Sequence, residues 1–359
     1  MPTPEPHFAL SPLCHDLLPI PSVYSVAQIG VGYWGPNLLR NLAASDRCRV
    51  VAVADASAER RAFASKICPG ARLAASAEEV VSDESIQAVV IATPARTHFK
   101  IAMEALRAGK HILVEKPIAT SVREVDEIAR EASARGLVAM SGHTFLFNPA
   151  VRFLKQVLSS GDLGDVRYIY SQRLNLGRIR SDVDALWNLA PHDISIMQYL
   201  MDDMPPSSIR RLGMDFIQPG IDDVVFLDLI YPCKALAHIH VSWLDPHKVR
   251  SLTIVGSKKM AVYDDVADSK IAIYDKGIEP KAVLGERMDY DAGQPPSFIH
   301  RTGDVRLPAI PWQEPLKNEI AHFIDCIEGK AACIAGPDHA REVVRILESA
   351  GATTGESCA

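Results

Sequence analysis

The stretch Val26-Ala-Gln-Ile-Gly30-Val-Gly-Tyr-Trp-Gly35-Pro-Asn-Leu38 decides the fold. A short apolar run precedes the pattern Gly-x-Gly-x-x-Gly and a helical pattern follows it, as in sheets that bind a dinucleotide at a helix N-terminus. The first glycine permits a tight turn, the second lets the backbone approach a pyrophosphate, and the third lets strand and helix pack closely. The stretch therefore predicts a cofactor site at Gly30, Gly32, Tyr33, Trp34 and Gly35.

The residues beyond this stretch repeat a strand–helix rhythm, which is typical of a doubly wound parallel sheet. Capping boxes from Ser76 to Glu79 and from Ser121 to Glu124 predict helix starts. The predicted strands are nearly continuous in apolar residues, as strands covered on both faces must be. They are Val26–Val31, Val50–Ala54, Ala88–Ile91, His111–Val114 and Val138–Ser141.

Asp55 lies at the end of the second predicted strand, where a carboxylate accepts hydrogen bonds from the adenosine ribose. The same carboxylate repels a 2′-phosphate, so we expect NAD rather than NADP. The alternative is a solvated strand-end acid that caps the next helix.

After Phe147 the pattern changes to strand-like runs joined by turn residues, which predicts an antiparallel sheet. Helices are expected at Pro191–Met201 and Glu314–Gly329, while 278–315 gives no clear pattern. The expected strands are Val166–Gln172, Val224–Ile230, Ala235–Trp243, Val249–Val255 and Lys259–Tyr263. The fold class is α/β: an N-terminal Rossmann doubly wound parallel sheet with a C-terminal α+β domain that carries a large, mostly antiparallel open sheet. The expected parts are a loose tail (1–25), the Rossmann domain (26–145), a substrate-binding and oligomerisation domain (146–350) and a C-terminal tail (351–359).

Composition excludes several classes of partner. The 359 residues carry 38 Lys and Arg against 44 Asp and Glu, a net charge of −6, and no basic block, so we expect neither a nucleic-acid nor a membrane partner. The first 25 residues contain no Lys or Arg and lack the basic start of a secretory signal. The seven cysteines are scattered without a Cys-x-x-Cys pair, which argues against disulfides or a zinc site and favours a cytoplasmic protein.

The motif Glu115-Lys116-Pro117, together with Gly30–Gly35, Ala92-Thr93-Pro94 and His98, resembles the Gfo/Idh/MocA family of sugar and cyclitol oxidoreductases. The resemblance runs from about Val26 to Ala350. It implies that Lys116 is catalytic, beside the nicotinamide and the reacting hydroxyl, and that the Lys116–Pro117 bond is cis; the alternative is an ordinary surface lysine. The further cofactor-binding residues that it implies are Ala56, Thr93, Pro94, His98 and Glu115.

The segment Leu186-Trp-Asn-Leu-Ala-Pro-His192-Asp-Ile-Ser195 matches the family's second catalytic segment, with His192 at the position of the catalytic histidine. Relatives commonly carry an acid four residues earlier, where this chain has Asn188, which cannot take a proton. His192 then carries the acid/base role alone or with water. The alternative is a histidine that caps or packs at a helix N-terminus.

The resemblance also implies substrate-binding residues: His143 at the domain junction and Arg178 on a loop, with Asn188 and His192. Arg178 and Arg180 are able to clamp a carboxylate or phosphate, or are surface charges. His238 and His240 lie on one strand face but have no third ligand at a recognisable spacing, so no metal is expected. We expect Cys326 and Cys333 to be small core residues.

These features imply an NAD-dependent enzyme in which His192 takes the proton of a sugar hydroxyl and Lys116 stabilises the developing alkoxide. The motifs look most like the nucleotide-sugar branch, in particular UDP-N-acetylglucosaminuronate 3-dehydrogenases. Alternatives are a 3-ketoreductase of a nucleotide deoxysugar, an inositol dehydrogenase, and a non-catalytic NAD- or sugar-sensing regulator. We expect a homodimer or homotetramer formed through the C-terminal sheet.

Overall fold

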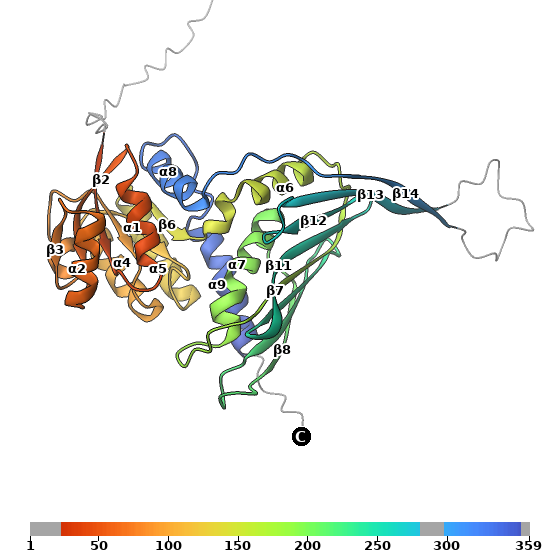
Figure 1. Cartoon of the computed structure of the whole chain (residues 1–359), viewed down its shortest axis with the longest axis horizontal. Coiled ribbons are helices and arrows are strands. Elements are labelled where there is room, and N and C mark those ends of the chain that lie inside the picture. Colours follow the sequence, from red (N-terminus) through yellow and green to blue (C-terminus); the bar gives the residue numbers. More distant parts are fainter. Residues whose placement is uncertain (1–22, 281–297, 353–359) are drawn as a thin grey trace, which may run out of the picture.

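The computed structural model describes residues 23–280 and 298–352, which form two sheets with helices around and between them (Figure 1). The first sheet has six parallel strands in the order β3-β2-β1-β4-β5-β6, so the strand order reverses beside β1. Its strands are β1 (Tyr24–Ile29), β2 (Cys48–Ala54), β3 (Arg72–Ala74), β4 (Ala88–Ile91), β5 (His111–Glu115) and β6 (Ala139–Gly142). Its helices are α1 (Gly35–Ala43), α2 (Ala58–Ile67), α3 (Glu78–Val81), η1 (Ala95–Thr97), α4 (His98–Arg107) and α5 (Val122–Ala134).

This sheet confirms the predicted doubly wound fold. The central strands β1, β4 and β5 are buried along most of their length, which explains their continuous apolar runs. The first capping box forms in full: the Ser76 hydroxyl accepts the amide of Glu79 while the Glu79 carboxylate accepts that of Ser76. In the second, Ser121 accepts the amide of Glu124, but the Glu124 carboxylate accepts the amide of Thr120 and not that of Ser121. The short edge strand β3 was missed because two of its three residues are exposed.

The second sheet has eight strands in the order β14-β13-β12-β11-β7-β10-β9-β8. Its pairings are antiparallel except that of β7 with β10, as expected for a mostly antiparallel sheet. The strands are β7 (Val166–Leu176), β8 (Ser208–Met214), β9 (Val224–Ile230), β10 (Leu236–Ser242), β11 (Leu244–Gly256), β12 (Met260–Asp264), β13 (Ile271–Pro280) and β14 (Phe298–Arg306). The helical elements of this half are η2 (Thr144–Phe147), α6 (Pro149–Ser159), α7 (Ala185–Leu200), α8 (Pro315–Ile327) and α9 (Pro337–Ala352).

Helices α6, α7 and α9 gather on the side of the second sheet that faces the first domain (Figure 1). Alternate strand residues such as Ile169, Ala237 and Ile239 enter this core. Their neighbours Tyr168, Tyr170 and Leu236 are exposed. The self-association expected through this sheet stays a prediction.

Two sequence interpretations need correction. Helix α7 begins at Ala185 and not at Pro191, because Asp184 caps it by accepting the amide of Trp187 at 2.9 Å. Pro191 therefore lies inside the helix, and His192 follows it in the second turn rather than at the N-terminus. Helix α9 and strands β8, β13 and β14 were not predicted. Within the segment 278–315, residues 278–280 end β13 and residues 298–306 form β14.

The last part of the chain returns to the first domain. Leu316, Ile320 and Phe323 of α8 join the core that contains Leu38 and Leu39 of α1. The predicted tail up to residue 22 and the end after 352 lie outside the described residues, whereas Tyr24 already belongs to β1. Within the described ranges, no helix is both long and apolar enough to cross a bilayer.

Candidate active site

The glycine loop after β1 is held by a buried glutamine. Gly30 adopts a φ of 95°, and a Cβ at this position would lie 2.5 Å from the carbonyl oxygen of Ala92, so only glycine fits. The side-chain amide of Gln28 donates to the carbonyl oxygens of Gly30 and Gly35 at 2.9 and 2.8 Å. This buried clamp fixes the loop shape before any ligand binds.

Asp55 braces the same loop from the end of β2. Its carboxylate accepts the amide of Val31 at 2.8 Å and the amide of Ser57 at 2.9 Å. A carboxylate has about four acceptor positions, so two remain for ribose hydroxyls. The alternative, that Asp55 caps the next helix, is true in part. Ser57 is the N-cap of α2, and Asp55 orients Ser57 by accepting its amide.

A cavity of about 400 Å³ opens beside this loop. A Cβ at Gly32 would project into open space with no described atom within 4 Å, which leaves room for a pyrophosphate. Tyr33 is 88% exposed and Gly35 is buried beneath the loop. The predicted cofactor residues that line the cavity are Gly30, Gly32, Asp55, Ala56, Thr93 and Pro94.

Lys116 joins the two domains. The Lys116–Pro117 peptide is cis, as the resemblance implied. The ammonium of Lys116 donates to the backbone carbonyl of Asn188 on α7 at 2.9 Å, and the side-chain oxygen of Asn188 accepts the indole N–H of Trp243 at 3.3 Å. Asn188 is thus held between Lys116 and Trp243, with its amide NH₂ left to donate.

His192 lies one turn after Asn188 on α7 and packs edge-on against Phe145, with ring centroids 5.1 Å apart. Its Nδ1 is buried and has no hydrogen-bond partner among the described residues. Burial lowers the pKa of the imidazole well below its usual value, and the positive charges of Lys116 and Arg173 lower it further. His192 is therefore neutral at pH 7, the form that accepts a proton.

Two buried acids lie behind Lys116. Burial raises the pKa of the Glu115 carboxyl, against the lowering effect of Lys116. Glu319 of α8 accepts a hydrogen bond from the Thr144 hydroxyl at 3.0 Å, and burial together with Glu115 raises its pKa well above its usual value. Burial also lowers the pKa of the Lys116 ammonium, so its proton is held less tightly than that of a surface lysine.

Arginines surround the His192 side of the site. Arg173 is buried and forms an ion pair with Asp193 at 2.5 Å, while its guanidinium lies over Phe145. Arg250 is held by the carbonyl oxygen of Leu174 at 2.9 Å, and burial with the Arg173 charge lowers its pKa. Because Asp193 neutralises Arg173, the cationic Arg250 and Lys116 favour an anionic ligand.

The other predicted site residues lie on an exposed loop or in the buried interior. Arg178 is exposed on the loop before α7, but Arg180 is bound bidentately by Asp182 at 2.8 and 2.6 Å, which weakens the idea of an arginine clamp. His143 is buried, 2% exposed, against the ring of His339. His98 is also buried and its ring nitrogens meet the carbonyl oxygens of Thr93 and Pro117 at 2.7 and 2.8 Å, so it braces the ends of β4 and β5.

Sequence reasoning missed Gln28, Arg173, Arg250 and Glu319. Their contacts join segments far apart in the chain, as with Arg173 and Asp193, which local spacing does not reveal. The one available signal was Asp193 directly after His192, since a buried acid needs a partner.

Two family profiles match the chain. Residues 24–143 match the family described as "Oxidoreductase family, NAD-binding Rossmann fold", and residues 151–262 match the "GFO/IDH/MocA C-terminal domain". Together they cover the first sheet and the part of the second sheet from β7 into β12, but not β13 or β14.

Individual proteins give the same picture. The UDP-N-acetylglucosamine 3-dehydrogenase of Acidithiobacillus ferrooxidans is 32% identical over 195 residues, which are 54% of this chain and 59% of that protein. The 2,7-anhydro-N-acetylneuraminate hydratase of Mediterraneibacter gnavus is 25% identical over 280 residues, 74% of this chain and 73% of that protein. A solved structure from Magnetospirillum magnetotacticum, described as that of an oxidoreductase, superposes with a TM-score of 0.77 at 27% identity and covers 91% of this chain and 99% of that chain.

Proposed function

The chain belongs to the Gfo/Idh/MocA family of NAD-binding oxidoreductases, and from this we propose that it oxidises a secondary hydroxyl of a nucleotide sugar. The substrate we propose is UDP-N-acetylglucosaminuronate or a close analogue, with C3 as the reacting carbon and NAD as the cofactor. The observation that carries the proposal is the hydrogen bond from Lys116 to the backbone of Asn188, because it holds the motif lysine against the helix that bears His192.

The chemistry divides between these two side chains. When bound, the nicotinamide supplies the hydride acceptor. His192, kept neutral by burial, takes the hydroxyl proton. Lys116 donates a hydrogen bond to the substrate oxygen and stabilises the negative charge that develops on it. Glu115 lies beside Lys116 and opposes the fall in its pKa, which helps to keep the ammonium protonated.

The substrate class rests on two observations. A relative named for UDP-N-acetylglucosamine 3-dehydrogenation is 32% identical over half of this chain. The cationic surroundings of His192, with Arg250 and Lys116 not fully neutralised, suit a substrate that carries a carboxylate. An inositol would engage Lys116 at its reacting hydroxyl but carries no anionic group for Arg250.

The test is a panel of sugars under single-turnover conditions. NAD-loaded protein is mixed separately with UDP-N-acetylglucosaminuronate, UDP-N-acetylglucosamine and myo-inositol, and the absorbance of reduced nicotinamide is recorded. We expect the fastest rise with the uronate. A rise with myo-inositol alone contradicts the substrate class, and binding of the sugars without any reaction would establish a sensor instead. Because one relative is a hydratase, each mixture is also analysed by mass spectrometry for a product formed without net NADH.

We also propose that NAD is preferred over NADP, because the carboxylate of Asp55 stands at the end of β2 and repels a 2′-phosphate. We expect the wild-type chain to bind NADP at least about tenfold more weakly than NAD, since a like-charge contact costs more than about 1.4 kcal/mol. The change Asp55→Asn removes the negative charge, so the NADP and NAD dissociation constants are expected to become more similar. The affinity for NAD is also expected to fall, because asparagine keeps only one of the two amide contacts. Both dissociation constants are measured by fluorescence titration; equal affinities in the wild-type chain would refute the preference.

A further inference from the structure

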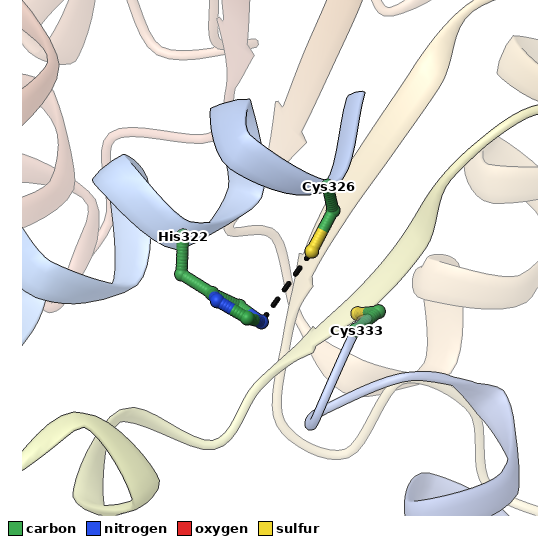
Figure 2. A group of neighbouring side chains, drawn as sticks. All are labelled: His322, Cys326 and Cys333. Atoms are coloured by element: carbon green, nitrogen blue, oxygen red, sulfur yellow. Dashed lines mark hydrogen bonds between the residues drawn. The ribbon is translucent and has the colours of Figure 1, made fainter. Parts of the chain in front are cut away.

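A histidine and two cysteines come together at the end of α8 (Figure 2). His322 and Cys326 lie one turn apart on the helix, and Cys333 follows on the loop to α9. The nearest ring nitrogen and both sulfur atoms lie within 4.8 Å of one another. Cys326 belongs to the core and Cys333 packs against it, as the sequence predicted. The sequence did not indicate that the two cysteines and His322 lie together.

The hydrogen bonds fix the state of the histidine. The backbone amide of Ile334 donates to His322 Nε2 at 3.3 Å. Since an amide only donates, Nε2 carries a lone pair and the ring proton is on Nδ1. The same Nε2 lies 3.4 Å from Cys326 Sγ. Nε2 is thus the unprotonated nitrogen and lies within reach of the Cys326 thiol, and a neutral imidazole is the form of histidine that coordinates a metal.

The spacing suits a tetrahedral ion. With Zn–S bonds of about 2.3 Å and Zn–N bonds of about 2.0–2.1 Å, neighbouring ligand atoms are roughly 3.5–3.8 Å apart. The Cys326–His322 distance of 3.4 Å already meets this spacing. The largest separation of 4.8 Å requires Cys333 to move by only about 1 Å, and Cys333 lies on a loop.

The surroundings favour a neutral complex with one open position. Cys326 is 9% exposed, and His322 and Cys333 are half-buried, so solvent reaches one side. The nearby carboxylate of Asp325 is already paired with Arg47 at 2.7 Å. Two thiolates cancel the double charge of a zinc ion, which lowers the cost of placing it in a half-buried site.

We propose that His322, Cys326 and Cys333 bind one Zn²⁺ ion, with water as the fourth ligand. Both thiols give up their protons to solvent on binding, while the histidine enters as the neutral ring. The bond from His322 Nε2 to zinc replaces the long hydrogen bond that Nε2 accepts from the Ile334 amide.

The ion would brace the connection between α8 and α9. Two residues after Cys333, the carbonyl of Ala335 accepts the amide of Ser141 on β6 at 2.8 Å, and Gly336 then leads into α9. The His322 ring lies 5.2 Å from that of Phe147 in η2. Zinc is therefore expected to stabilise the fold where α8 meets the first domain and to leave the chemistry at Lys116 unchanged.

The test uses the full chain, reduced and freed of metal with a chelator, and titrated with Co²⁺ as an optical substitute for zinc. Cys14, Cys233 and Cys358 are first changed to serine to remove thiols that are exposed or lie outside the described residues. We expect one equivalent of Co²⁺ to produce thiolate charge-transfer bands and tetrahedral visible bands, and Zn²⁺ to displace it. Zn²⁺ is also expected to raise the Tm of this triple-serine variant, which serves as the parent for the next change.

The variant C326S/C333S, made in the same parent, removes both sulfur ligands with little change of volume. Its affinity is expected to fall by at least about a hundredfold, since even groups behind the ligands contribute 10- to 100-fold. A second measurement needs no variant: in the wild-type chain, Zn²⁺ should protect Cys326 and Cys333 from alkylation, while exposed Cys233 reacts as before.

Four results would overturn the proposal. The first is that Co²⁺ gives no stoichiometric thiolate bands, and the second is that the bands persist in C326S/C333S. The third is that zinc protects no cysteine. The fourth is that peptide mapping of the unreduced protein finds a Cys326–Cys333 disulfide that remains after reductant and zinc are added.

Discussion

Replacing Lys116 with methionine is expected to lower kcat by about 10²–10³-fold, the usual cost of removing one donor from a developing oxyanion. Methionine keeps most of the length and apolar volume of the lysine stem but neither donates a hydrogen bond nor carries charge. The glycine loop and Asp55, which are fixed by Gln28 and by backbone amides, remain intact, so the NAD dissociation constant should stay within a few-fold of the wild-type value. Single-turnover absorbance and fluorescence titration measure the two quantities.

The matched control is Lys100→Met, because Lys100 is an exposed lysine of α4 in the same domain, and it should leave kcat unchanged. A near-normal kcat for Lys116→Met would remove Lys116 from the mechanism. Equal losses in both variants would indicate general destabilisation.

Lys116 also sets an alkaline limit. The reaction needs the protonated ammonium, and burial lowers its pKa, so activity is present below this pKa and is lost as pH rises through it. The fall in kcat/KM should therefore begin below the ordinary lysine value of about 10.4. Lys116→Arg stays charged to far higher pH, so its residual activity should lack this alkaline fall.

Changing His192 to asparagine is expected to lower kcat by about 10²–10⁴-fold, the range that general acid–base catalysis contributes. Asparagine keeps hydrogen-bonding ability but cannot take a proton. The neutral imidazole is the active form, and its pKa is lowered by burial, so wild-type activity is lost only as pH falls well below about 6.5. The variant should therefore have a lower kcat and should also no longer show this loss of activity at low pH.

The control is His238→Asn, since His238 lies on β10 outside the site, with its Nδ1 2.6 Å from a carboxylate oxygen of Asp228. The pH dependence of kcat is measured for both variants over the whole pH range. If the loss of activity at low pH survives in His192→Asn, it belongs to another group. In that event His192 only positions the substrate, and the proton goes elsewhere.

Local patterns predicted the first domain well because neighbouring residues determine it. The Gln28 contacts of the glycine loop and the Ser76–Glu79 cap join residues that are close in sequence, the apolar runs mark the buried strands, and Lys116–Pro117 carries its own motif. The pattern misplaces the start of α7 because proline favours the first helical turn, whereas Asp184 supplies the cap seven residues before Pro191.

The parts that escaped prediction depend on distant pairs. The buried Arg173–Asp193 ion pair joins β7 to α7, and Glu319 reaches the site because α8 returns to the first domain. The parallel pairing of β10 with β7 also needs the whole sheet order. The neighbourhood of Cys326 and Cys333 follows from the turn after α8, which no cysteine spacing motif marks.

The most direct test is hydride transfer from C3. UDP-N-acetylglucosaminuronate deuterated at C3 is incubated with the protein and NAD, and the reduced cofactor is analysed by mass spectrometry. Our account predicts that the deuterium appears on the nicotinamide, that the sugar becomes a ketone, and that both events are about 10²–10³-fold slower in Lys116→Met. Reduced cofactor without deuterium, or a bound sugar that keeps its deuterium and never reduces the cofactor, would contradict it.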